Sequence, residues 1–78
     1  MSEPVDRDLT LLLARAFDLA WEQYYEAEND RALPEEVARP ALAKFLVDMA
    51  RNGVKEERAL VASGILHLVA LTMENPRD

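Results

Sequence analysis

Residues 55–73 read KEERALVASGILHLVALTM, and this stretch decides the fold that the sequence predicts. Its apolar residues recur at helical rather than strand spacing. At about 100° per residue, the polar side chains line up only as one narrow stripe. That stripe consists of Glu56, Ser63, His67 and Glu74. Apolar side chains cover most of the remaining circumference, so we expect this helix to be buried nearly all round.

The apolar part of this helix, residues 59–73, is too short to cross a membrane, because a span needs about 18 or more residues. Two neighbouring helices cover only roughly half of its surface. A soluble protein rarely leaves a large apolar patch exposed, so the remainder predicts contact with a second copy or another protein. The candidate interface residues on this helix are Leu60, Val61, Gly64, Ile65, Leu68, Val69 and Met73.

Gly64 lies in the middle of the same helix, where glycine costs up to about 1 kcal/mol relative to alanine. A close approach of another backbone would explain its presence. The alternative is a tolerated glycine without a packing role.

Residues 6–29 form the second helical pattern. Steps of three or four place one set of apolar side chains on its inward face. This set is Leu9, Leu13, Ala16, Phe17, Ala20, Tyr24 and Ala27. Ser2 or Asp6 can cap the start of the helix. The stretch 29–31, which has no apolar period and precedes Pro34, predicts its end.

Two prolines mark the middle helix, predicted over residues 35–52. Pro34 suits a first helical position, where its missing N–H needs no partner. Pro40 inside a helix costs on the order of 3 kcal/mol, so we expect a kink or a break there. Gly53 predicts the end of the helix. The apolar face comprises Leu42, Phe45, Leu46 and Met49.

These patterns predict an all-α fold, a small three-helix bundle that dimerises through its third helix. The predicted helices cover residues 6–29, 35–52 and 55–73. All 78 residues form one domain, with frayed ends at 1–5 and 75–78. A chain of this length buries a small fraction of its surface, and oligomerisation is a common remedy.

Charge is distributed unevenly along the chain. Residues 1–39 contain ten acidic residues and four arginines, whereas residues 40–78 contain five of each sign, so the net charge of −6 falls on the first half. Such a field repels phosphates and anionic headgroups, and we expect no nucleic-acid or membrane partner. The apolar run 9–14 follows acidic residues and ends at Arg15, unlike a secretory signal. Together with the absence of cysteine, this favours a cytoplasmic protein.

Trp21 and Tyr25 form a second apolar region on the first helix. Both residue types are enriched in interfaces, because they bury large areas and keep a polar tip. They could equally lie at the edge of the intramolecular core.

No catalytic or metal site is predicted. Asp18, Glu22 and Glu26 repeat on one helical face, but His67 is the only histidine and no Glu-x-x-His pair exists to complete a metal site. Ser63 lies four residues from His67, yet a serine in mid-helix has no free backbone N–H groups beside it to stabilise an oxyanion. We therefore expect no enzyme activity, no cofactor and no metal.

The predicted function is a protein–protein interaction module, most simply a homodimer. One alternative is a small apolar ligand held between Phe17, Trp21, Phe45, Met49 and the third helix. A less favoured alternative is DNA binding, because residues 50–55 resemble the turn of a helix-turn-helix. The negative net charge opposes that function.

Overall fold

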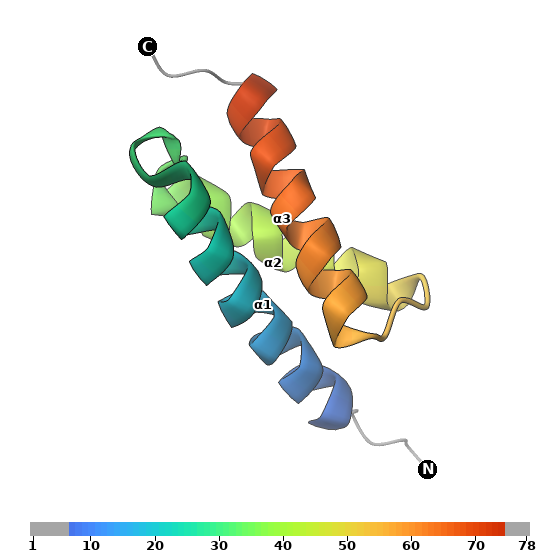
Figure 1. Ribbon diagram of the computed structural model, residues 1–78. Coiled ribbons are helices and arrows are strands. Elements are labelled where there is room, and N and C mark those ends of the chain that lie inside the picture. Colours follow the sequence, from blue (N-terminus) through green and yellow to red (C-terminus); the bar gives the residue numbers. More distant parts are fainter. Residues whose placement is uncertain (1–6, 75–78) are drawn as a thin grey trace.

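A computed structural model describes residues 7–74, apart from the side chain of Arg7. It contains three α-helices, α1 (Arg7–Glu28), α2 (Glu35–Arg51) and α3 (Glu57–Glu74), and a short 3-10 helix, η1 (Asn29–Arg31). Helices α1 and α3 lie side by side and run in the same direction, while α2 crosses behind them on the return path (Figure 1). The predicted all-α three-helix bundle is confirmed. The predicted caps Ser2 and Asp6 and the predicted frayed ends lie outside the described residues.

The first helix ends where its apolar pattern ends. Asn29 has a φ of 48°, a left-handed conformation that asparagine tolerates better than most residues. The backbone N–H of Ala32 then donates to the carbonyl of Asn29 at 3.1 Å. On the predicted inward face, Ala16 and Ala20 are fully buried, whereas Ala27 at the end of the face is exposed.

The two prolines of α2 behave differently from each other. Pro34 directly precedes the helix as its N-cap, and its carbonyl accepts hydrogen bonds from the N–H groups of Val37 and Ala38, both at 2.9 Å. Pro40 lies inside α2, which continues through it, so of the kink or break expected there the break does not occur. Pro40 is exposed, and Glu36, whose carbonyl loses its helical partner, is exposed as well. Water can therefore satisfy that carbonyl.

Gly53 ends α2 as predicted. Its φ of +97° lies in the left-handed region that favours glycine. The N–H of Gly53 donates to the carbonyl of Ala50, and the N–H of Val54 donates to the carbonyl of Met49, both at 3.0 Å. This pair of bonds is the Schellman arrangement, which satisfies the last carbonyls of a helix. The next helix begins at Glu57, two residues later than expected.

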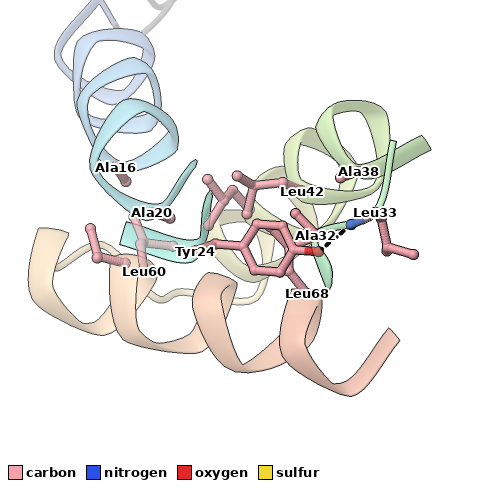
Figure 2. Close-up of a cluster of buried hydrophobic side chains, with 11 residues drawn as sticks. Ala16, Ala20, Tyr24, Ala32, Leu33, Ala38, Leu42, Leu60 and Leu68 are labelled. Atoms are coloured by element: carbon pink, nitrogen blue, oxygen red, sulfur yellow. Dashed lines mark hydrogen bonds between the residues drawn. The ribbon is translucent and has the colours of Figure 1, made fainter. Parts of the chain in front are cut away.

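Gly64 lies where α3 packs against both other helices. A Cβ atom at this position would lie 2.8 Å from Cδ1 of Leu42, 3.3 Å from Cδ2 of Leu46 and 3.5 Å from Cβ of Ala20. The crowding at Gly64 therefore comes from side chains of α1 and α2 in the same chain, and not from the second backbone that was expected. Leu42 and Leu46 belong to the buried core that fills the space between the helices (Figure 2).

Tyr24 carries the polar group at the centre of this core. The side chain is fully buried, and its hydroxyl oxygen lies 2.8 Å from the backbone nitrogen of Leu33 and 2.7 Å from Oγ1 of Thr72. Figure 2 shows the ring directed from α1 toward the segment that contains Leu33. This hydroxyl therefore links three segments: α1, the segment between α1 and α2, and α3.

Candidate interaction site

Four of the predicted interface residues on α3 lie in the core of the chain itself. Leu60 and Leu68 are fully buried, Val61 is 9% exposed and Gly64 is buried. In this fold they offer no surface to a second chain. When a helix is apolar on nearly every side, its sequence does not indicate which side faces the core. The structure shows that the side with these four residues is the one that contacts α1 and α2.

The other predicted interface residues of α3 lie nearer the surface. Ile65 and Val69 are half-buried and pack against the edge of the core. Met73 is 74% exposed. Of the seven predicted interface residues on α3, Ile65, Val69 and Met73 are therefore the ones with exposed surface.

The outward side of α3 carries a continuous apolar row, here called the outer seam. Successive members are three, four, three and four residues apart, the spacing of a helix-pairing seam. They are Ala59, Ala62, Leu66, Val69 and Met73. Leu66 is 68% exposed, and neither acidic residues nor Lys or Arg occur between Arg58 and Glu74. Sequence reasoning missed Leu66, although the alternating spacing was the signal that could have identified it.

The polar stripe of α3 faces α2 at one point. The imidazole ring of His67 stacks on the ring of Phe45, with centroids 4.2 Å apart and planes inclined by 6°. Within residues 7–74, Ser63 and His67 form no hydrogen bond with each other. The histidine thus belongs to the packing between α2 and α3.

Trp21 and Tyr25 differ in their burial. Trp21 is half-buried against the core, where its ring lies 5.8 Å from that of Tyr24 and 5.5 Å from the guanidinium carbon of Arg39. Tyr25 stacks on the outer side of Trp21 at 5.8 Å and is 50% exposed. Trp21 therefore lies at the core edge, and Tyr25 remains available at the surface.

An apolar groove, the α1–α2 groove, opens between the first two helices with a volume of about 220 Å³. Its lining consists of Leu13, Ala14, Phe17, Ala43, Leu46 and Val47. Of the four aromatic and methionine residues predicted to hold an apolar ligand, only Phe17 lines it. Phe45 lies instead against His67 of α3. This groove therefore shares only Phe17 with the residues predicted to hold an apolar ligand.

Charged residues lie on the surface and form few contacts. Among residues 7–74, two ion pairs occur, between Arg15 and Glu57 at 3.0 Å and between Lys44 and Asp48 at 3.8 Å. In the same part of the chain, no three His, Asp or Glu side chains come together as metal ligands. None of the described helices combines the length and hydropathy needed to cross a membrane.

Residues 7–74 thus present an apolar row on α3, the outer seam, and an apolar groove between α1 and α2. No protein-family model, curated protein or solved structure matches this chain.

Proposed function

We propose that this chain is a homodimeric protein–protein interaction module, in which the α3 outer seams of two copies pack against each other. The observation that carries the proposal is the exposure of Leu66 and Met73, 68% and 74%, in a row with helix-pairing spacing. A contiguous exposed apolar row on a soluble protein commonly marks a contact surface. Ala59 and Ala62 have small side chains that allow a second helix to approach closely, at an interaxial distance of about 8 Å.

Charge favours an antiparallel pair of α3 helices. Centred on Leu66, an antiparallel pair places Arg58 of one copy level with Glu74 of the second copy. A parallel pair would instead bring the two Glu74 side chains to the same end and align the two helix dipoles unfavourably. The seam itself has no formal charge, so two chains of net charge −6 can meet there with the least repulsion.

The length of the seam limits the affinity. From Ala59 to Met73 the helix rises by about 21 Å. Stable interfaces bury about 800 Å² per partner, and one helical seam provides less. We therefore expect a two-fold symmetric dimer with a dissociation constant in the micromolar range.

Sedimentation equilibrium of the purified chain from about 5 to about 200 µM tests the proposal, because it covers the expected dissociation constant. We expect the average mass to rise from monomer toward dimer with concentration. Leu66→Lys should keep the chain monomeric, since it buries an unpaired charge in the seam. Leu11→Lys is the matched control, because Leu11 is 58% exposed on α1 and the substitution changes the net charge equally.

A wild-type chain that remains monomeric over this range would contradict the dimer. Equal loss of association in Leu66→Lys and Leu11→Lys would contradict its placement on the seam, because only one of the two residues belongs to it.

A further inference from the structure

The α1–α2 groove has a charged end. The guanidinium carbon of Arg39 lies 5.1 Å from the ring centroid of Phe17, a groove-lining residue, and 5.5 Å from that of Trp21. Arg39 lies one helical turn before Ala43 and two before Val47, both of which line the groove. The cation therefore lies beside the Phe17 part of the groove, one turn before the first α2 residue of its lining.

Arg39 is free to bind an anion. Neither ion pair among residues 7–74 involves it, and the side chain is exposed. A guanidinium group that stacks on aromatic rings keeps its N–H donors at its edge, where they can hold a carboxylate in a bidentate pair. Glu35, one turn earlier on α2, forms no ion pair with Arg39 within the same described residues.

The spacing of Arg39 and Val47 along α2 sets the length of an alkyl chain that would reach from the cation across the groove. From Arg39 to Val47 the helix rises by about 12 Å, which an extended alkyl chain of about nine or ten carbons matches. The groove volume of about 220 Å³ and its apolar lining suit methylene groups rather than polar ones. The charged end of such a ligand would thus meet the Arg39 guanidinium group, and its alkyl end would meet apolar side chains.

We propose that the α1–α2 groove binds a free medium-chain alkanoate, with its carboxylate on Arg39 and its alkyl chain along Phe17 and Ala43 toward Val47. This site is separate from the α3 outer seam and does not depend on dimerisation.

Titration with sodium hexanoate, octanoate and decanoate, each below its micelle-forming concentration, tests the proposal. Trp21 is the single tryptophan and lies against Arg39, so its emission reports binding at the charged end. Amide chemical shifts in ¹⁵N-labelled chain report the position of the alkyl chain. We expect affinity to rise about two- to fourfold for each added methylene until the groove is filled.

Octanol serves as the uncharged counterpart of octanoate. We expect wild-type chain to bind octanoate about 1.5- to fivefold more tightly than octanol, the range that corresponds to an exposed ion pair. Arg39→Gln should abolish this difference and leave the affinity for octanol nearly unchanged. A merely structural role of Arg39 would instead weaken both ligands together.

Ala43→Phe should fill the groove and weaken both ligands at least tenfold. Ala27→Phe is the matched control, because Ala27 is an exposed alanine of α1 outside the groove lining. Circular dichroism verifies that each variant keeps its helices. Leu66→Lys should retain octanoate binding, so failure of the proposed dimer and failure of this site remain distinguishable.

Four results would overturn the proposal. Octanoate and octanol could bind the wild-type chain equally, which would remove Arg39 from the site. Ligand-induced shifts could centre on the α3 outer seam, or appear only above the micelle-forming concentration. Groove resonances could shift on dilution without ligand, which would assign the groove to a second copy of the chain.

Discussion

The hydroxyl group of Tyr24 lies 2.7 Å from Oγ1 of Thr72, and this contact joins α1 to α3 in the interior of the bundle. Oγ1 of Thr72 donates its one hydrogen to the carbonyl of Leu68 at 2.8 Å. The hydrogen between the two hydroxyls must therefore come from Tyr24, which in turn accepts from the N–H of Leu33 at 2.8 Å. The buried hydroxyl of Tyr24 thus both donates and accepts a hydrogen bond. These two bonds hold the segment between α1 and α2 against α3.

Tyr24→Phe should destabilise the chain. The substitution removes two hydrogen bonds and leaves the N–H of Leu33, whose residue is only 6% exposed, without its partner. Leaving a buried donor unsatisfied costs about 1–3 kcal/mol. Urea denaturation followed by circular dichroism measures the loss in the free energy of unfolding. Tyr25→Phe is the control, because Tyr25 is 50% exposed and should change stability by less than about 0.5 kcal/mol.

Gly53→Ala should destabilise the chain through the backbone alone. A Cβ at Gly53 meets no atom within 4 Å, but the residue holds a φ of +97°. A left-handed conformation costs an L-residue roughly 1–2 kcal/mol, and the same urea experiment should show that loss. Gly53→Asn should lose less, because asparagine tolerates this region better. Equal losses for alanine and asparagine would contradict the assignment to backbone conformation.

Gly64→Val should destabilise the chain through packing, since a Cβ there already lies 2.8 Å from Leu42 and the branched side chain must displace it. Overpacking a core costs about 1–3 kcal/mol. Ala62→Val is the control on the exposed side of the same helix, where the larger side chain has room. Thermal unfolding should show a clear drop in Tm for Gly64→Val and a small change for Ala62→Val. A similar drop for both would indicate an effect of helix propensity rather than of packing.

Periodicity predicts the three helices well, because each helix repeats apolar residues at steps of three or four and ends at a local signal in the sequence. The apolar steps, the 29–31 break and Gly53 act over a few residues, and the observed bounds lie within two residues of the predicted ones. The hydrogen bond between Tyr24 and Thr72 has no such local cause. They lie 48 residues apart, so no local pattern could pair them.

The candidate site was predictable only in part, because α3 is apolar on nearly every side. Hydrophobicity alone assigns Leu68, which is fully buried, and Leu66, which is 68% exposed, to the same class. Gly64 did mark a close helix contact, but the contact is with Leu42 and Ala20 of the same chain. The position of Arg39 over Phe17 depends on how α2 crosses α1, which the sequence pattern does not specify.

Pro40→Ala should stabilise the chain, because α2 continues through Pro40 and lacks the hydrogen bond that an N–H there would donate to Glu36. A proline in a helix interior costs about 3 kcal/mol relative to alanine. Proline also restricts the unfolded chain, and losing that restriction offsets about 0.4–1 kcal/mol. A net gain of about 2 kcal/mol should raise the urea midpoint without changing the slope of the transition. Ala43→Pro, the reverse change at an exposed position of the same helix, should destabilise by a similar or larger amount. A Pro40→Ala chain no more stable than the wild type would contradict a net cost of Pro40 in α2, because the restriction that proline places on the unfolded chain would then compensate for the missing bond.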